Sequence, residues 1–126
     1  MGDTICRIEE HNDVTILVLT LDSVDEHQSR ELTSVFSSLL DEGHCKIVLD
    51  LSNTVYVASM VLSSMMFFRK KAKAAGGGLV ILGVNDRIGE ILATTKLDKV
   101  FKIFGNKDEA IAYFEGKGIL RRFLGK

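Results

Sequence analysis

The sequence predicts a single α/β domain built on a mixed sheet of four or five strands with about four helices. Short runs rich in Val, Ile and Leu alternate along the chain with longer segments of helical periodicity. The first two strand-like runs are joined by a turn too short for a crossover, which makes them antiparallel. Beyond that pair, simple alternation predicts parallel strands with right-handed helical crossovers. The 126 residues are enough for one domain with a real core.

Five segments have the composition of strands, rich in β-branched and large apolar residues. The first alternates apolar and polar residues, which is typical of an edge strand, and a turn at His11, Asn12 and Asp13 separates it from the second. The second is rich in Val, Ile, Leu and Thr, which is typical of a buried strand. The expected strands are residues 4–9, 14–21, 47–51, 79–84 and 100–104.

Four segments carry apolar residues at helical spacing, at residues 28–41, 59–75, 87–95 and 107–114. Asn85 or Asp86 is expected to cap the third helix and Asn106 the fourth. The glycines at 76–78 are expected to end the second helix. The domain is therefore expected to span residues 1–115. Residues 116–126 form a basic, partly apolar tail, which either packs or frays as a terminal segment or contacts a membrane or partner.

Composition argues against several classes of function. Hydrophobic residues make up 46% and charged residues 26% of the chain, as in globular proteins, and the net charge of -1 gives no bulk attraction to nucleic acid. No apolar run approaches the ~18 residues of a membrane span. Cys6 and Cys45 have no metal-ligand spacing and suit the reduced thiols of a cytoplasmic protein. We therefore expect no metal, no cofactor and no nucleic-acid partner.

The second helix carries more apolar surface than one core face requires. At about 100° per residue, one line of residues with its flanks suffices to cover the sheet. Met60 and Phe67 fall on another line, together with Ser64 and Lys71, and have no obvious place in that core. Exposed apolar groups of this kind indicate a docking surface, whereas helix rotation or a homodimer contact would bury them. The core line is Val61, Met65, Phe68 and Ala72, flanked by Leu62, Met66 and Arg69.

Ser59 lies where this helix begins, beside the carboxyl end of a buried strand. One interpretation is a helix N-cap, which needs only a hydroxyl group. The other is a phosphorylation site, because the added charge of about -1.5 to -2 suits a helix N-terminus but not an apolar partner. A catalytic serine is disfavoured, since neither a partner histidine nor G-x-S-x-G is present.

Asp22 and Ser23 follow the second expected strand. Loops at the carboxyl ends of parallel strands meet at one rim of the sheet, so these two residues are expected near Ser59. Local turn chemistry is the alternative role for both.

Three groups of residues stand in a characteristic order along the chain. The first is L-T-L-D at residues 19–22, followed by E-L-x-x-x-F at 31–36. The second is IVLDLSNTVYV at 47–57, followed by Ser59 and Leu62. The third is GGGLVILGVNDRIGEILATTKLDKVFKIF at 76–104, followed by DEAIAYF. In order and spacing they resemble the STAS domain family, especially bacterial anti-sigma-factor antagonists, over residues from about 4 to 114.

The resemblance implies a cytoplasmic regulatory protein that works by partner switching and is not an enzyme. In that family the loop before the second helix usually reads D-S-[S/T]-G-L. Its first serine is phosphorylated by a GHKL-type serine kinase that is also the anti-sigma factor. Phosphorylation ends the complex, and a phosphatase resets the cycle. By this resemblance Ser59 is the candidate phosphorylation site.

This chain departs from the family pattern around the serine. Ala58 stands in place of the acidic residue, Met60 in place of the second hydroxyl residue, and Val61 in place of the glycine. A divergent antagonist of this kind could bind its partner constitutively. The candidate partner-binding residues are Asp22, Ser23, Ala58, Ser59, Met60, Ser63, Ser64 and Phe67.

Two other functions stay open at this stage. One is a constitutive accessory subunit, such as the small STAS partner of an ABC lipid transporter. The other is a scaffold module in a signalling complex, as a homo-oligomer or a nucleotide binder. Neither requires a phosphorylated serine.

Overall fold

A five-stranded sheet in the order β1-β2-β4-β6-β7 organises the molecule. In the computed structural model, residues 5–124 are described, with side chains described for residues 5–115. Strand β1 is antiparallel to β2, and every other pair of neighbours is parallel. The expected mixed sheet with four helices is therefore confirmed.

The sheet strands are β1 Cys6–His11, β2 Val14–Leu19, β4 Lys46–Asp50, β6 Gly78–Leu82 and β7 Ile103–Phe104. Two short strands, β3 Ser23–Val24 and β5 Tyr56–Val57, pair in parallel as a separate ribbon. The helices are α1 Glu26–Asp41, α2 Ser59–Ala74, α3 Asp86–Thr94 and α4 Lys107–Leu124, with a 3-10 turn η1 at Leu97–Lys99.

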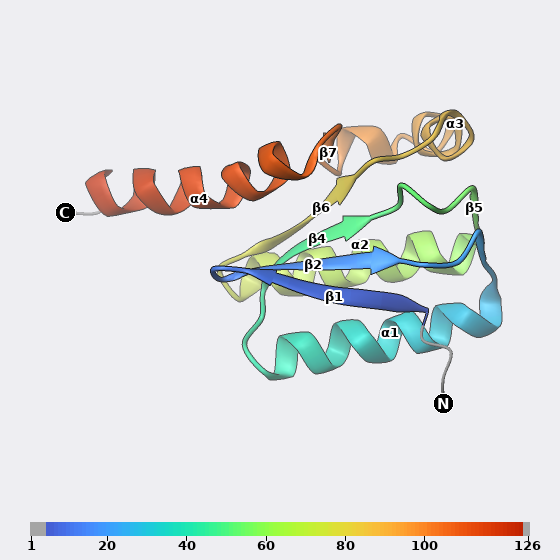
Figure 1. Cartoon of the computed structure of the whole chain (residues 1–126), viewed down its shortest axis with the longest axis horizontal. Helices are drawn as coiled ribbons and strands as arrows, with labels where there is room; N and C mark the ends of the chain where they lie inside the picture. The colour runs from blue at the N-terminus through green and yellow to red at the C-terminus, as the bar shows by residue number, and fades with distance from the viewer. Residues whose placement is uncertain (1–4, 125–126) are drawn as a thin grey trace.

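Each face of the sheet has its own apolar core. Successive side chains of a strand point to opposite faces, so in β2 Leu17 and Leu19 join the core beneath α1, α2 and α3, whereas Ile16 and Val18 join the core beneath α4. Figure 1 shows α1 and α2 on one side of the sheet and α4 on the other. All six residues of β2 are buried, as expected for a strand covered on both faces.

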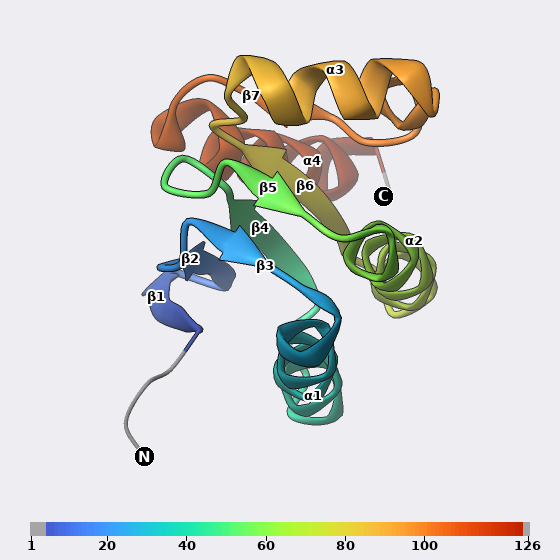
Figure 2. The same ribbon diagram turned by 90° about the vertical axis from the view of Figure 1, so that its right-hand side faces the viewer.

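The carboxyl ends of the parallel strands meet at one rim of the molecule. The β3–β5 ribbon and the first turns of α1 and α2 lie at this rim, which faces the viewer in Figure 2.

At the opposite end of α2, Gly76 follows the helix with φ 98°, a conformation that glycine adopts without steric cost. The expected glycine stop after this helix is confirmed.

The last strand is shorter than expected. Lys96 adopts a left-handed conformation, φ 64°, and residues 97–99 then form the 3-10 turn η1 just before the expected strand. Phe101 turns into the main core, with 3% of its surface exposed, so only Ile103 and Phe104 pair with β6. The expected strand at 100–104 was therefore wrong at its beginning, because Phe101 packs into the core and the pairing with β6 begins only at Ile103.

Other element boundaries also differ from the expected ones. Helix α1 begins two residues earlier than expected because Asp25 caps it. Strand β2 ends at Leu19, after which the Thr20 N–H donates to the Ile5 carbonyl at 3.0 Å and the chain leaves the sheet. Helix α4 extends through Leu124, so its backbone continues into the expected tail. Side chains of the tail lie outside the described residues, and its role stays a prediction.

Candidate functional site

The β3–β5 ribbon brings the two predicted rim residues beside the approach to α2. The Asp22 carbonyl accepts the N–H groups of Val55 and Tyr56 at 2.7 and 3.2 Å. Ser23 pairs with Tyr56 in the ribbon, and the Ala58 N–H donates to the Val24 carbonyl at 2.9 Å. Asp22 and Ser23 are thus held next to the residues that lead into Ser59, as the topology of parallel strands predicts.

A buried threonine ties the loops of this rim together. Thr54 is fully buried, and its hydroxyl donates to the Leu21 carbonyl at 2.8 Å. The Asn85 side-chain amide donates to the Thr54 carbonyl at 3.0 Å, while its oxygen caps α3 by accepting the Ile88 N–H at 2.9 Å. The loops after β2, β4 and β6 therefore form one connected unit. Sequence reasoning gave Thr54 no role, since nothing local distinguishes it from the exposed Asn53.

Ser59 is the first residue of α2, and it does not cap the helix. Ala58 occupies the N-cap position in an extended conformation and offers no side-chain hydrogen bond. The N-cap interpretation of Ser59 was therefore wrong, because the extended backbone already ends at Ala58 and Ser59 has helical conformation. The Ser59 side chain is exposed, and its hydroxyl makes no hydrogen bond within the described residues.

Helix α2 differs from its neighbours at this end. Asp25 caps α1, Asn85 caps α3, and the Asn106 side chain accepts the Glu109 N–H near the start of α4. The first turn of α2 contains no acidic residue. Backbone N–H groups and the positive end of the helix dipole are therefore left without a side-chain anion beside an exposed hydroxyl.

An exposed face runs along α2 from this end. We use the name rim face for Val55, Tyr56, Met60, Ser63 and Phe67. The exposed fractions of Met60 and Phe67 are 42% and 54%, and those of Val55 and Tyr56 are 48% and 45%. The Phe67 ring packs edge to face against the buried Phe68 at 4.9 Å, so it is supported from below while its outer side faces solvent.

The core side of α2 agrees with the helical pattern in all but one residue. Val61, Leu62, Met65, Phe68 and Ala72 are buried. Met66, expected to flank the core, is 40% exposed. It lies about 120° around the helix from Met60, beyond the arc that the sheet and α1 cover.

Two of the predicted contact residues turn away from solvent. The exposed fraction of Ala58 is 7%. Ser64 is half-buried, and its hydroxyl lies 3.1 Å from that of Thr33 on α1, so it joins the two helices. The side chains of Asp22, Ser23, Ser59, Met60, Ser63 and Phe67 are exposed. Sequence reasoning missed Val55 and Tyr56, although their short apolar run before the helix was the available signal.

Neither a metal site nor a membrane-spanning helix is found in the described part of the chain. Residues 5–115 contain no group of three or more His, Cys, Asp or Glu side chains arranged to hold a metal ion. None of the described helices combines the length and the apolar character needed to cross a membrane. Cys6 and Cys45 are partly buried and unpaired, and burial raises the pKa of the Cys6 thiol.

The sequence model of the STAS domain matches residues 6–110, and the chain therefore belongs to the STAS domain family. A Thermotoga neapolitana protein, described as a candidate anti-sigma factor antagonist homologous to TM1081, is 29% identical over 83 residues, covering 66% of this chain and 74% of that protein. The chain is thus anti-sigma-factor-antagonist-like by distant homology.

Solved structures agree on the fold. The crystal structure of TM1081 from Thermotoga maritima, a candidate anti-sigma factor antagonist, superposes with a TM-score of 0.80 at 24% identity, covering 87% of this chain and 94% of that one. Unphosphorylated SpoIIAA, an anti-sigma factor antagonist, superposes with a TM-score of 0.77 at 14% identity, covering 88% and 96%. At these identities the structures show a shared fold.

Proposed function

We propose that this protein is a cytoplasmic, non-catalytic antagonist that binds an anti-sigma factor with GHKL-type serine kinase activity through the rim face. The observation that carries the proposal is an exposed apolar stripe on the helix that begins at Ser59, with Met60 and Phe67 42% and 54% exposed. Large apolar side chains that are exposed to water and surrounded by polar loop residues are typical of a protein-binding surface. The distant homology to antagonists supports the kind of partner.

Phosphorylation of Ser59 would act on this surface directly. Its hydroxyl is exposed and free of intramolecular hydrogen bonds within residues 5–115. A phosphate of about -1.5 to -2 charge would lie at a helix N-terminus with unpaired N–H groups, so the fold would tolerate it. The same charge would enter the contact surface next to Met60, where burying it against an apolar partner is unfavourable. A phosphatase would restore binding.

The residues around Ser59 favour a second candidate, a constitutive adaptor without a phospho-switch. Ala58 and Met60 remove the acidic and hydroxyl neighbours that the family pattern places there. Met60 also enlarges the apolar surface. Such a protein would bind its partner, or an accessory site of a transporter or scaffold, whether or not a kinase is active.

One set of variants separates these functions. The cognate anti-sigma kinase, purified after identification by pull-down, is titrated with wild type, Ser59→Ala, Ser59→Asp and the control Ser34→Asp. Ser34 is an exposed serine on α1 and is not part of the rim face. The switch predicts that Ser59→Asp weakens binding at least about tenfold, a loss of about 1.4 kcal/mol. Ser59→Ala and Ser34→Asp should bind like wild type.

The kinase reaction supplies the second readout. With ATP, mass spectrometry should find phosphate on Ser59 of wild type and none on Ser59→Ala. Binding that ignores both Ser59 substitutions, with no phosphate transferred, would support the constitutive adaptor. The antagonist function is rejected if no variant binds any anti-sigma kinase. It is also rejected if light scattering shows that the rim face instead forms a homodimer.

A further inference from the structure

We infer that a second site, at the end of α2 remote from Ser59, binds a small anion of the phosphate class. A hollow of about 230 Å³ lies between the second half of α2, the start of β6 and the segment from η1 to β7. Its lining includes four cationic side chains from these separate segments and no acidic side chain. This site does not depend on the proposed antagonist function. The four cations are Arg69, Lys73, Lys99 and Lys102.

The convergence of these cations is not explained by helix electrostatics. Lys73 lies in the last turn of α2, where the helix dipole favours positive charge. Lys99 and Lys102 come from the other wall of the hollow. Lys99 ends η1, whose three residues give only a weak dipole, and Lys102 lies beyond that turn. Within residues 5–115, none of the four cations has a salt-bridge partner. Four like charges around one concavity repel one another, and a bound anion would relieve that repulsion.

The edge of β6 adds a backbone donor to the site. Strand β7 pairs only with Ile81 and Leu82, so the first half of β6 has no strand on its outer side. The Gly78 N–H donates inward to Cys45, and the Ile81 N–H donates outward to Lys102. Alternation along the strand therefore directs the Leu79 N–H outward, toward the hollow that this residue lines. An amide donor without a strand partner suits an anionic oxygen.

One of the cations is already held in position. The Arg69 guanidinium lies 5.9 Å from the centre of the buried Phe101 ring and is half-buried, so it loses less freedom on binding than an exposed lysine. Its planar donors match two oxygens of a phosphate group. The hollow is small compared with most drug-sized ligand sites, which favours inorganic phosphate, pyrophosphate or the headgroup phosphate of a lipid.

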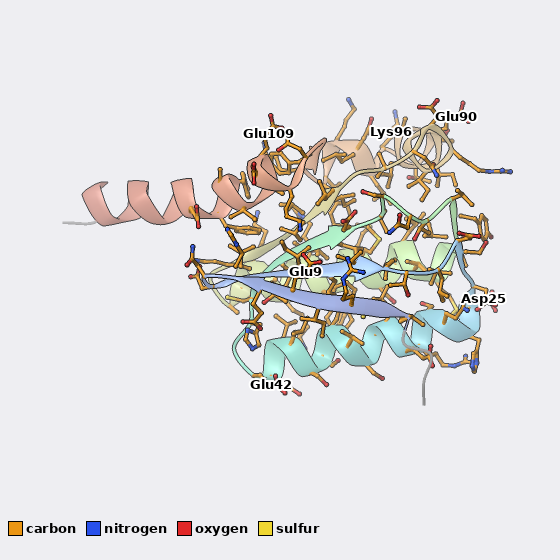
Figure 3. The ribbon with its side chains drawn as sticks, viewed as in Figure 1. Glu9, Asp25, Glu42, Glu90, Lys96 and Glu109 are labelled. Carbon is orange, nitrogen blue, oxygen red and sulfur yellow. The ribbon has the colours of Figure 1, made fainter. Side chains whose placement is uncertain are left out.

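The test is a titration of the full chain with pyrophosphate in about 0.15 M salt, followed by amide chemical shifts, because salt at this strength screens weak surface attraction. We expect saturable shifts at Gly77, Gly78 and Leu79, with a Kd of about 1 mM or tighter. The variant Lys73→Gln/Lys102→Gln should weaken binding at least tenfold. The control Lys70→Gln/Lys96→Gln removes two exposed lysines that do not line the hollow and should bind like wild type; Figure 3 shows Lys96 beside α3.

Vesicles distinguish the source of the phosphate. Sedimentation with phosphatidic acid vesicles that depends on Lys73 and Lys102, without saturable pyrophosphate binding, would assign the site to a lipid headgroup. Saturable pyrophosphate binding without vesicle binding would assign it to a free anion. The inference is overturned if neither probe binds, or if the two double variants lose binding equally, because either result leaves only a diffuse positive surface.

Discussion

At the scale of single residues, the rim face depends on a difference between two neighbouring phenylalanines. Phe68 is 3% exposed and belongs to the core, whereas Phe67 is 54% exposed and makes only an edge contact with it. The Lys71 ammonium lies 5.2 Å from the Phe67 ring, so the ring is partly covered by a cation rather than by apolar groups. Substitutions at Phe67 should therefore affect binding more than folding.

Phe67→Asp is expected to lower affinity for the anti-sigma kinase at least about tenfold, because it places a carboxylate in the apolar contact. The free energy of unfolding should fall by no more than about 1.5 kcal/mol, the scale of the lost ring contacts. Met66→Asp is the matched control, since Met66 is exposed on another side of the same helix. Equal losses of affinity in both variants, by calorimetry, would show that the rim face is not the contact.

Gly83 connects β6 to the rim and tolerates no side chain. Its φ is 74°, and an added Cβ would collide with the Ser52 hydroxyl, which itself donates to Asp50 at 2.6 Å. Gly83→Ala is expected to cost about 1–3 kcal/mol of unfolding free energy in urea titrations. Gly105→Ala should cost far less, because nothing lies within 4 Å of its added Cβ. A Gly83→Ala protein as stable as wild type would contradict the described loop geometry.

At the scale of elements, the helices differ in how they begin. Helix α1 has a complete capping box, in which Asp25 accepts the Gln28 N–H at 3.0 Å and the Gln28 side chain accepts the Asp25 N–H at 2.9 Å. Asp25 lies at the start of α1 in Figure 3. Helix α2 has no side-chain cap, and its position against the sheet comes from buried apolar residues and from the Thr33–Ser64 contact with α1.

Asp25→Ala is therefore expected to destabilise the protein by about 1 kcal/mol, because the Gln28 N–H at the start of α1 loses its side-chain acceptor. Glu31→Ala, an exposed position within the same helix, should change the unfolding free energy by less than about 0.5 kcal/mol. Thermal or urea unfolding provides both values. Equal effects of the two substitutions would mean that the capping box contributes nothing.

At the scale of the whole molecule, ion pairs join segments that are far apart in the sequence. Glu9 on β1 accepts from Lys107 on α4 at 2.9 Å, and Asp13, in the turn before β2, accepts from Lys46 on β4 at 2.9 Å. The hydrogen bond from Lys107 lowers the pKa of Glu9, and that from Lys46 lowers the pKa of Asp13. Both carboxylates are close to solvent, so each pair contributes modestly.

The direction of these shifts predicts a loss of stability in acid. Each carboxylate has a lower pKa in the folded chain than in the unfolded one, so its contribution is complete above the ordinary value and is lost as pH falls through the folded pKa. The urea midpoint should therefore drop between about pH 5 and pH 3. Lys46→Ala/Lys107→Ala should show a smaller drop than Lys70→Ala/Lys96→Ala. Identical drops would exclude these pairs as a source of the acid response.

Local sequence patterns were enough to predict the α/β class, the antiparallel pairing of the first two strands, the order of the main strands and helices along the chain and the buried stripe of α2. These features follow from local periodicity and turn length, which depend only on residues close together in the sequence. It also identified Met60 and Phe67, because a helix covering a sheet on one side leaves residues opposite the core without partners.

The roles of Ser59, Thr54 and Phe101 depend on contacts that exist only in the folded molecule. Ala58 caps α2 because its N–H donates to the Val24 carbonyl at the end of the β3–β5 ribbon, which pairs segments more than thirty residues apart. The Thr54 hydroxyl donates to the carbonyl of Leu21, which is distant in the sequence, and Phe101 packs into the core. Such contacts depend on which side chains meet after the chain has folded, so they cannot be predicted from a local sequence pattern.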